Sequence, residues 1–387
     1  MEIGYAAPGD VRAVIESLGR TEDVRFSPGN RRLAIAAFIR NRIAVLDVGI
    51  AAADGASEVT LTGATEIAAS CLSCPHGLDF IDDDTLVVAS RKGDLAVFDL
   101  LSGSRPADLQ PAQILRADEA SLLNAPGSLA ITRRSGSPPE LLVCNNDGHS
   151  VTRHRIERGS GGFRIADGET LLRRWLNLPD GICVSHDGHW IAVSNHNTHD
   201  VLLYRNTPSL DEHADPDGVL RCVHFPHGLR FTVDGRHIIV ADAGAPYVHI
   251  YASEGQGWAG ARSPVRSVRI MDEATFLRGR HNPQEGGPKG IDIDRGMNVL
   301  VVTSEHQPLA FFDLPAMLAD LLAGGPVLEV RYELGILEQA ERLRTRAAQA
   351  ESRAAKAEAR LLAKKGRKAW RIAGPLRRAC SALWRPN

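Results

Sequence analysis

The sequence predicts a six-bladed β-propeller, and three observations favour this fold class. A unit made of a turn, an apolar strand-like run, a tight turn and further strand-like runs returns six times, and such self-similarity is typical of repeat architectures. Asp-Gly turns such as Asp234-Gly235 separate apolar runs, as in β-hairpins. Helical periodicity is absent before the C-terminal region, apart from short apolar pieces near Pro315–Leu322. A pair of β-sandwiches would not predict six equivalent copies.

The six predicted blades begin near residues 22, 75, 126, 179, 226 and 288, within a propeller domain spanning residues 1–333. Equivalent positions of the copies are Asp23, Gly77, Ser128, Gly181, Gly228 and Gly290, at steps of 54, 51, 53, 47 and 62 residues. These steps are slightly longer than the roughly 40–50 residues of a four-stranded blade.

Strand positions are clearest in the fourth and fifth copies. The fourth predicts strands at Ile182–Ser185, Trp190–Asn195, Val201–Tyr204 and Val219–His224. The fifth predicts strands at Gly228–Val233, His237–Asp242, Tyr247–Tyr251 and Val265–Met271. For the outermost strand of the last blade, two segments are candidates: Val327–Tyr332 and the N-terminal run Val11–Ser17.

Composition narrows the function classes. The 387 residues are 43% hydrophobic, enough for a substantial core, and the net charge is -2. Eight of the 45 basic residues and none of the 47 acidic ones lie in Lys364–Asn387, so the remainder carries 37 basic and 47 acidic residues, or -10. Such an acidic body is not expected to bind nucleic acid.

Targeting signals are not visible, and we expect a cytoplasmic protein. The first residues lack a basic and then apolar leader, and no apolar run approaches the ~20 residues of a membrane span. The six cysteines are scattered, which suits a reducing compartment.

Several repeats resemble known propeller families. The segment from Val24 to Ile35 resembles the strand-turn-strand unit of bacterial WD-like and YncE-type propellers. Pro226-His227-Gly228-Leu229, with Ala241-Asp242-Ala243-Gly244, is similar to an NHL repeat. Pro179-Asp180-Gly181-Ile182 is similar to a repeat of the gluconolactonase/senescence-marker family. Together these resemblances cover about residues 22–330 and imply the propeller class.

In a propeller, residues at the start of the innermost strands face one mouth of the central channel. We expect this mouth to be polar and able to bind a ligand, because residues that begin the inner strands and residues that end the second strands converge there. The candidate ligand-binding residues are Glu22, His76, Asp180, His227, Lys289, Asn145, Asn195, His196, Asp242 and Glu305. In the same column, the third copy has Gly127.

The gluconolactonase resemblance implies a divalent ion at this mouth, with Glu22 and Asp180 at the matching ligand positions. Oxygen ligands suit a hard cation such as calcium, which could polarise a lactone carbonyl or activate water. The family's Asn in the blade before Asp180 is Gly127 here, which removes one ligand, and His76 does not favour calcium. An unspecific polar channel lining remains the competing interpretation.

Other motifs are weaker. Cys71-Leu72-Ser73-Cys74 has zinc-like spacing without a second pair, and we interpret it as a small buried loop. The turns His186-Asp187-Gly188-His189 and His196-Asn197-Thr198-His199-Asp200 are interpreted as exposed hairpin turns rather than metal sites. No nucleophile elbow, P-loop or dinucleotide fingerprint is present in the sequence.

The C-terminal region has a different pattern. Apolar residues spaced alternately by four and three predict an Ala-rich charged helix or coiled coil over residues 334–365, able to self-associate or to stay solvated. The basic tail, residues 366–387, could dock to an anionic membrane surface or a partner. Its Trp370-Arg371-Ile372 and Pro375-Leu376-Arg377 resemble the ending of bacterial cell-surface-polysaccharide glycosyltransferases. The docking residues are Arg367, Lys368, Trp370, Arg371, Leu376, Arg377 and Trp384.

Two function classes follow. The first is a non-enzymatic or accessory propeller that binds a glycan intermediate or a protein partner at its mouth, in cell-surface polysaccharide biosynthesis, with the tail docking it. The alternative is a divalent-metal-dependent lactonase or related hydrolase at the same mouth. The change at Gly127 favours the first class, and metal content separates the two.

Overall fold

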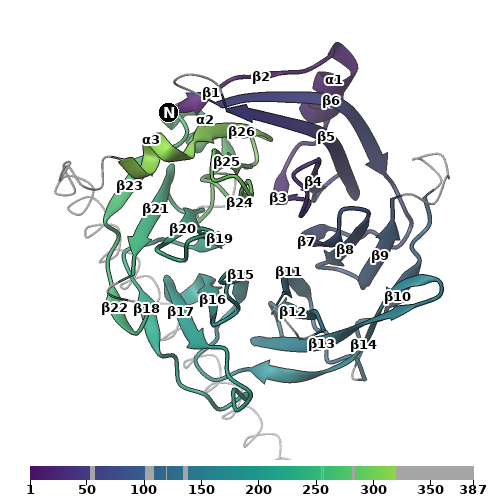
Figure 1. Cartoon of the computed structure of the whole chain (residues 1–387), viewed down its shortest axis with the longest axis vertical. Coiled ribbons are helices and arrows are strands. Elements are labelled where there is room, and N and C mark those ends of the chain that lie inside the picture. Colours follow the sequence, from purple (N-terminus) through teal and green to yellow (C-terminus); the bar gives the residue numbers. More distant parts are fainter. Residues whose placement is uncertain are drawn as a thin grey trace, which may run out of the picture. The chain divides into compact units, whose positions relative to one another are not determined.

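The computed structural model is a six-bladed β-propeller, as the repeats predict. It describes residues 1–52, 57–100, 109–118, 120–133, 138–253, 255, 257–280 and 284–319. Within these residues, six sheets of four or five strands stand around a central channel (Figure 1). The predicted helix at 334–365, the tail at 366–387 with its docking residues, and Val327–Tyr332 lie outside the described residues.

Blades one to three are built from neighbouring antiparallel strands, starting at the channel. Blade one comprises β3 (Thr21–Phe26), β4 (Arg32–Ala37), β5 (Arg42–Ala52), β6 (Ser57–Ile67) and β2 (Tyr5–Ala6). Blade two comprises β7 (Pro75–Asp82), β8 (Thr85–Ser90), β9 (Leu95–Asp99) and β10 (Gln113–Leu115). Blade three comprises β11 (Pro126–Thr132), β12 (Glu140–Asn145), β13 (Ser150–Gly159) and β14 (Gly162–Leu172).

Blades four to six follow the same order, and the strands of the fourth and fifth lie close to their predicted positions. Blade four comprises β15 (Pro179–Val184), β16 (Trp190–Asn195), β17 (Asp200–Arg205), β18 (Gly218–Leu220) and β22 (Gly260–Arg262). Blade five comprises β19 (Pro226–Phe231), β20 (His237–Asp242), β21 (Tyr247–Ala252) and β23 (Arg266–Arg269). Blade six comprises β24 (Ile291–Ile293), β25 (Val299–Val302), β26 (Ala310–Asp313) and β1 (Glu2–Ile3).

The N-terminus closes the ring, through a segment that the sequence did not single out. Strand β1 pairs antiparallel with β26 of blade six, and β2 pairs in parallel with β6 of blade one (Figure 1). The assignment of Val11–Ser17 as the closing strand is wrong, because these residues form most of helix α1 (Gly9–Ser17). Val11 and Ile15 lie one turn apart on the buried face of that helix, a spacing that suits a helix as well as an apolar strand-like run.

Apolar packing lies between the blades. In the described chain, the buried hydrophobic residues fall into six clusters, and each cluster joins two adjacent blades. Helix α1 covers the interface of blades six and one, where Val11, Ile15 and Leu18 are buried. Helices α2 (Glu273–Gly279) and α3 (Leu314–Ala319) add Phe276, Leu314 and Met317 to the interface of blades five and six. Helix α3 lies at the apolar pieces near Pro315–Leu322, whereas α1 and α2 have too few turns to give a clear period in the sequence.

The inner strands bring polar residues into the channel at two levels. In five of the six inner strands, the pairing register shifts near the start of the strand, which interrupts the alternation of side chains. As a result, two residues of each such strand face the channel. One lies just before Gly77 or its equivalent, and the other lies two positions after Gly77 or its equivalent. The first level lies at the channel mouth and the second lies deeper toward the opposite face.

Glycine lets the inner strands approach one another at this point. A Cβ on Gly181 would lie 2.0 Å from the carbonyl oxygen of His227, on the next blade. Gly77, Gly228 and Gly290 occupy equivalent positions and face the neighbouring inner strand in the same way. The six blades can therefore converge closely enough for side chains of different blades to meet. No helix among the described residues is long and apolar enough to cross a membrane.

Candidate functional site

Six of the ten predicted mouth residues form one buried cluster. Glu22, His76, Asp180, His227 and Lys289 begin the inner strands of five blades or immediately precede them, and His196 follows β16. Each of the six residues is at most 3% exposed. We call this group the mouth cluster. It lies at the centre of the propeller, where no single blade could assemble it.

Two imidazoles lie between two carboxylates. His227 Nε2 is 3.2 Å from Glu22 Oε2 and 3.3 Å from Asp180 Oδ2. His76 Nε2 is 3.7 Å from Glu22 Oε2 and 3.4 Å from Asp180 Oδ1. The rings of His76 and His227 are stacked, with centroids 5.2 Å apart. Four side chains from four blades therefore lie together, with the two rings between the two carboxylates.

Cations and amides hold the outer carboxylate oxygens. Arg20 donates to Glu22 Oε1, while Arg91 and Asn146 donate to Asp180 Oδ1 at 2.6 and 2.7 Å. Lys289 Nζ lies 3.4 Å from Glu22 Oε2 and 2.6 Å from Glu285 Oε2. These contacts fix the orientation of both carboxylates, and both oxygens of Asp180 face an imidazole, Oδ1 that of His76 and Oδ2 that of His227.

The electrostatic setting lowers the pKa of the two carboxyl groups and of the imidazoles of His76 and His196. Burial opposes ionisation of Glu22, but the charges of Lys289 and Arg20 hold its pKa well below the usual range. Burial likewise opposes ionisation of Asp180, and His227 and Arg91 hold its pKa well below normal. Burial, with the charge of Arg91, lowers the pKa of His76 to about 3. Neutral imidazole and ionised carboxylate are the forms that bind metal ions.

Several polar atoms of the cluster are buried without a hydrogen bond from any described residue: Glu22 Oε2, both ring nitrogens of His76, and His196 Nδ1. Buried polar atoms are normally satisfied, so each such atom calls for a missing partner. His196 Nδ1 is 3.5 Å from Asp180 Oδ2, and its Nε2 is 3.5 Å from Glu285 Oε1. Burial lowers the pKa of His196. His196 is thus buried in the mouth cluster, and its interpretation as an exposed turn residue is wrong.

The remaining four predicted residues lie elsewhere. Asn145, Asn195 and Asp242 are loop anchors: each accepts a hydrogen bond from a backbone N–H just before the inner strand of its own blade. The donors are Asn124, Asn177 and His224. Glu305 is half-buried, and its charge raises the pKa of Arg20.

The anchors explain which mouth residues the sequence analysis missed. At the end of the second strand the side chain holds a loop, whereas the next residue belongs to the mouth. Arg91 follows Ser90, Asn146 follows Asn145, and His196 follows Asn195. This shift of one position can be found in the repeats once His196 is recognised as a mouth residue, because His196 follows the end of its strand by one residue. Arg20 and Glu285 have no equivalent in the other copies, so nothing in the repeat pattern marks them.

Asn146 also explains why position 127 is a glycine. A Cβ on Gly127 would lie 2.0 Å from Asn146 Oδ1, so the Asn146 side chain occupies the space that a residue larger than glycine would need. The Asn146 amide reaches Asp180 from this position. The amide absent from position 127 is therefore supplied from a neighbouring strand of the same blade.

The weaker motifs do not form metal sites with one another in the described residues. Cys71 and Cys74 are half-buried free thiols. His186 and His189 are exposed, as interpreted from the sequence. His199 Nδ1 accepts the N–H of Phe225 at 3.1 Å and so joins blade four to blade five.

Comparison with known proteins defines the class and goes no further. No protein-family profile matches the chain, and no curated protein matches it in sequence. Solved structures match it widely, with 902 similar chains, so the fold alone does not select a function.

A functionally unknown protein from Desulfotomaculum acetoxidans matches with a TM-score of 0.51 and 12% identity, over 76% of this chain and 82% of that one. A proposed 6-phosphogluconolactonase from Bacteroides uniformis matches with a TM-score of 0.47 and 10% identity, over 73% and 77%. A luciferin-regenerating enzyme matches with a TM-score of 0.47 and 10% identity, over 76% and 91%. The class that fold and comparison define is the six-bladed β-propeller.

Proposed function

We propose that the mouth cluster binds a divalent transition-metal ion and that the protein is a metal-dependent hydrolase. One observation carries the proposal: Glu22, His76 and His227 each offer a ligand atom within 4.8 Å of the other two, and the two oxygens of Asp180 lie 3.4 and 3.3 Å from the same two rings. Ligands bound at about 2.1 Å in a tetrahedral site lie about 3.4 Å apart. Glu22 Oε2 and His76 Nε2, which have no hydrogen bond among the described residues, belong to this set.

The donor chemistry favours a transition metal over calcium. Two imidazoles with two carboxylates suit zinc, iron, manganese or cobalt, whereas calcium takes oxygen ligands. Glu22, His76 and His227 would hold the ion, with Asp180 beside them, and Arg20, Arg91 and Asn146 would orient the two carboxylates as outer partners. When bound, such an ion lowers the pKa of a coordinated water and polarises an ester carbonyl.

The neighbouring residues suit proton transfer. His196 links Asp180 to Glu285, whose side chain is 13% exposed at the rim. A neutral imidazole in this position can accept a proton from a water in the cluster, and the carboxylates of Asp180 and Glu285 would stabilise the imidazolium that forms. Arg20 and Arg91 are also partly exposed there and would favour an anionic ester or lactone as substrate.

Metal content and hydrolysis test this function together. Full-length protein, loaded with manganese, iron, cobalt or zinc, is analysed by elemental mass spectrometry and assayed on a panel of lactones and esters. We expect one ion per chain and hydrolysis that a chelator abolishes. Loss of an outer partner typically lowers metal affinity by about 10–100-fold. Glu22 and His227 would bind the ion directly, so Glu22→Gln and His227→Asn should each lower metal affinity by at least this factor. His189→Asn, which removes an exposed histidine of blade four, is the matched control and should keep both properties.

A specific observation favours a second candidate. The mouth cluster is nearly sealed, and the charges of Glu22, Asp180 and Glu285 are matched by Arg20, Arg91 and Lys289. A buried cluster with balanced charges suits a non-enzymatic propeller that binds a glycan intermediate or a protein partner in cell-surface polysaccharide biosynthesis. The basic tail would dock this propeller to a membrane or a partner. A wild-type protein without bound metal would rule out the hydrolase and leave this candidate. Bound metal without hydrolysis would assign the ion a structural role.

A further inference from the structure

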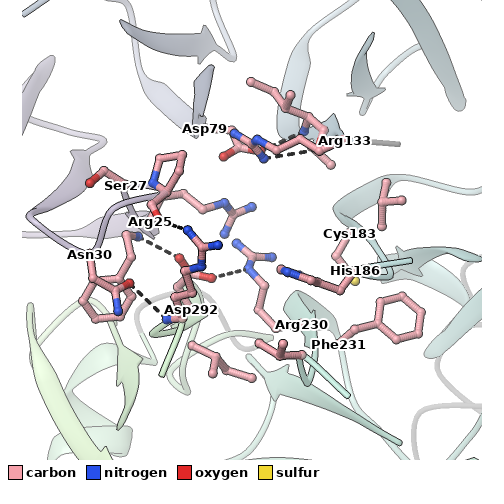
Figure 2. A pocket seen from close by; sticks show the side chains of 18 of the residues that line it. Arg25, Ser27, Asn30, Asp79, Arg133, Cys183, His186, Arg230, Phe231 and Asp292 are labelled. Atoms are coloured by element: carbon pink, nitrogen blue, oxygen red, sulfur yellow. Dashed lines mark hydrogen bonds and ion pairs between the residues drawn. The ribbon is translucent and has the colours of Figure 1, made fainter. Parts of the chain in front are cut away.

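A second polar site lies deeper in the channel, toward the face opposite the mouth cluster. A cavity of about 320 Å³ is lined there by the inner-strand residues three positions after those of the mouth. Figure 2 shows this cavity, which we call the basal cavity. Among these lining residues are Arg25, Asp79, Cys183, Arg230 and Asp292. The proposed metal function does not use any of them.

Arginines dominate the described wall of the basal cavity. Arg25, Arg133, Arg230 and Arg295 line it, against two aspartates. Adding Asp23, which lies 3.0 Å from Arg25 Nη1, still leaves four cations against three acids. His186 adds a further nitrogen-bearing side chain to the wall (Figure 2).

The acids are already engaged within the protein. Asp292 Oδ2 accepts the N–H of Phe26 at 2.7 Å, and its Oδ1 accepts Arg230 Nε at 2.7 Å. Asp79 accepts the N–H groups of Phe80 and Ile131 at 2.8 Å. These carboxylates tie one inner strand to the next and have little capacity to bind a further cation.

Arg230 has an unused donor. Arg230 is 9% exposed. Its Nε donates to Asp292, and its Nη1 donates to the carbonyl of Leu229. Its Nη2 is buried without a hydrogen-bond partner among the described residues, and it stays 3.9 Å from Asp23 Oδ1. A buried guanidinium N–H at a cavity wall without an acceptor indicates a missing anion.

Apolar side chains complete the wall and limit the size of the ligand. Phe26, Ile131, Val184, Phe231 and Ile293 line the same cavity. A volume of about 320 Å³ is at the lower end of small-molecule sites. The cavity can therefore hold a charged head group with a short organic body, rather than a polymer.

We propose that the basal cavity binds a small organic oxyanion, a phosphate or carboxylate compound, through Arg230 with Arg25 and Arg133. Arg230 Nη2 can donate a charge-assisted hydrogen bond to an oxygen of either head group, and the apolar wall contacts the organic part. This site is separate from the mouth cluster, so it does not depend on the metal proposal.

Calorimetric titration of the full-length protein tests this site, with glycerol 3-phosphate and malonate as probes and glycerol as the uncharged control. We expect saturable binding of at least one anion, and no binding of glycerol. Whichever probe binds more tightly identifies the head group. Arg230→Met should weaken binding by about 10–100-fold, the value of a charged hydrogen bond.

Matched variants distinguish loss of the anion site from loss of folding. Arg230→Lys retains the charge next to Asp292 but loses the Nη2 donor, so it should fold like the wild type and still bind more weakly. Arg205→Met removes an exposed arginine of blade four and should bind like the wild type. His227→Asn should also retain anion binding, even where metal binding is lost. Failure of both anions to bind the wild type, or equal binding by Arg230→Met, Arg230→Lys and the wild type, would overturn the proposal.

Discussion

Buried carboxyl groups of this propeller have pKa values that are shifted in opposite directions. Burial raises the pKa of Glu22 and Asp180, but Lys289 and Arg20 beside Glu22, and His227 and Arg91 beside Asp180, outweigh it and keep both pKa values low. Asp292 lies deeper in the channel, where Arg25 and Arg230 are its cationic neighbours and Asp23 adds a like charge. Burial dominates there and raises the pKa of Asp292 to about 6. The same residue type therefore has two different roles in one channel.

Asp292 should make stability fall as the pH rises. Its folded pKa of about 6 exceeds the unfolded value of 3.8, so between these values the folded state binds more protons than the unfolded state. The contribution of Asp292 is fully present below about pH 4 and is lost as the pH rises through 6. The loss is up to about 3 kcal/mol. Urea unfolding of the wild type and Asp292→Asn from about pH 4 to 8 measures it.

The comparison of the two proteins measures this carboxyl group together with its effect on its acidic neighbours. The amide introduced by Asp292→Asn stays neutral, so the stability of the wild type relative to the variant should decrease between about pH 4 and 7. The charge of Asp292 also raises the pKa of Asp23 and of Asp79, so the difference includes these two groups, whereas distant titrating groups cancel. A difference that is constant with pH, or that grows as the pH rises, would show that Asp292 ionises normally.

Inner strands are the elements that build both sites. Five of the six carry an early irregularity in register, and in most a small residue lies next to the neighbouring blade with a polar residue before it and another two positions after it. The alternation of an ideal strand would place the two polar levels on different faces. The irregularity lets one short strand contribute to the mouth cluster and to the basal cavity.

Gly181→Ala should destabilise the propeller, because the new Cβ would lie 2.0 Å from the carbonyl oxygen of His227. Backbone on both blades would have to shift, at a cost of about 1–3 kcal/mol or more. The same shift would displace Asp180 and His227 and should reduce metal binding. Chemical denaturation and metal titration measure the two effects. Gly49→Ala is the control, since no atom lies within 4 Å of its added Cβ, and it should leave both properties unchanged. Wild-type stability in Gly181→Ala would contradict the close approach of the two strands.

At the scale of the whole propeller, the N-terminal segment closes the ring of blades. Strand β1 completes blade six, and β2 continues along the edge of blade one, so one short segment joins the two blades. The N–H of Asp313 also donates to the carbonyl of Met1 at 2.7 Å. Tyr5 packs edge-on against Phe311, with ring centroids 5.7 Å apart.

Removing residues 2–6 should therefore lower stability. Loss of the two short pairings and of the Tyr5 contact should reduce the free energy of unfolding by on the order of 3 kcal/mol, at about 1 kcal/mol per hydrogen bond or ring contact. Thermal unfolding of the truncated and full-length proteins checks this. Replacing residues 2–6 with five glycines retains the chain length and should destabilise the protein to a similar degree. A truncated protein as stable as the full chain would mean that the ring closes without this segment.

Much of the fold could be predicted because the repeats are explicit. The inner strands begin within a few residues of the predicted blade starts, and His237–Asp242 is a strand with the predicted bounds. The closing strand could not be predicted, because β1 has two residues and its partner is more than 300 residues away along the chain. Such a short pairing leaves no period in the sequence.

The candidate site was predictable in part. Glu22, His76, Asp180, His227 and Lys289 share one column of the repeat, and the fold brings that column together. Asn145, Asn195 and Asp242 share another column, but a backbone N–H occupies each of them. A sequence does not distinguish a polar side chain that holds its own loop from one that faces the channel, since both follow an apolar strand.

The sequence by itself determined the number of blades, the approximate position of the inner strands and most of the polar residues of the mouth. Periodicity sets these features, and it is a property of the chain. Only the tertiary structure decided that Arg20, Arg91, Asn146 and Glu285 join the mouth, and that four arginines line a second cavity below it. Arg91 and Asn146 reach Asp180 on another blade, and the arginines of the second cavity come from several blades. Distances between blades depend on ring closure and on the packing of the inner strands.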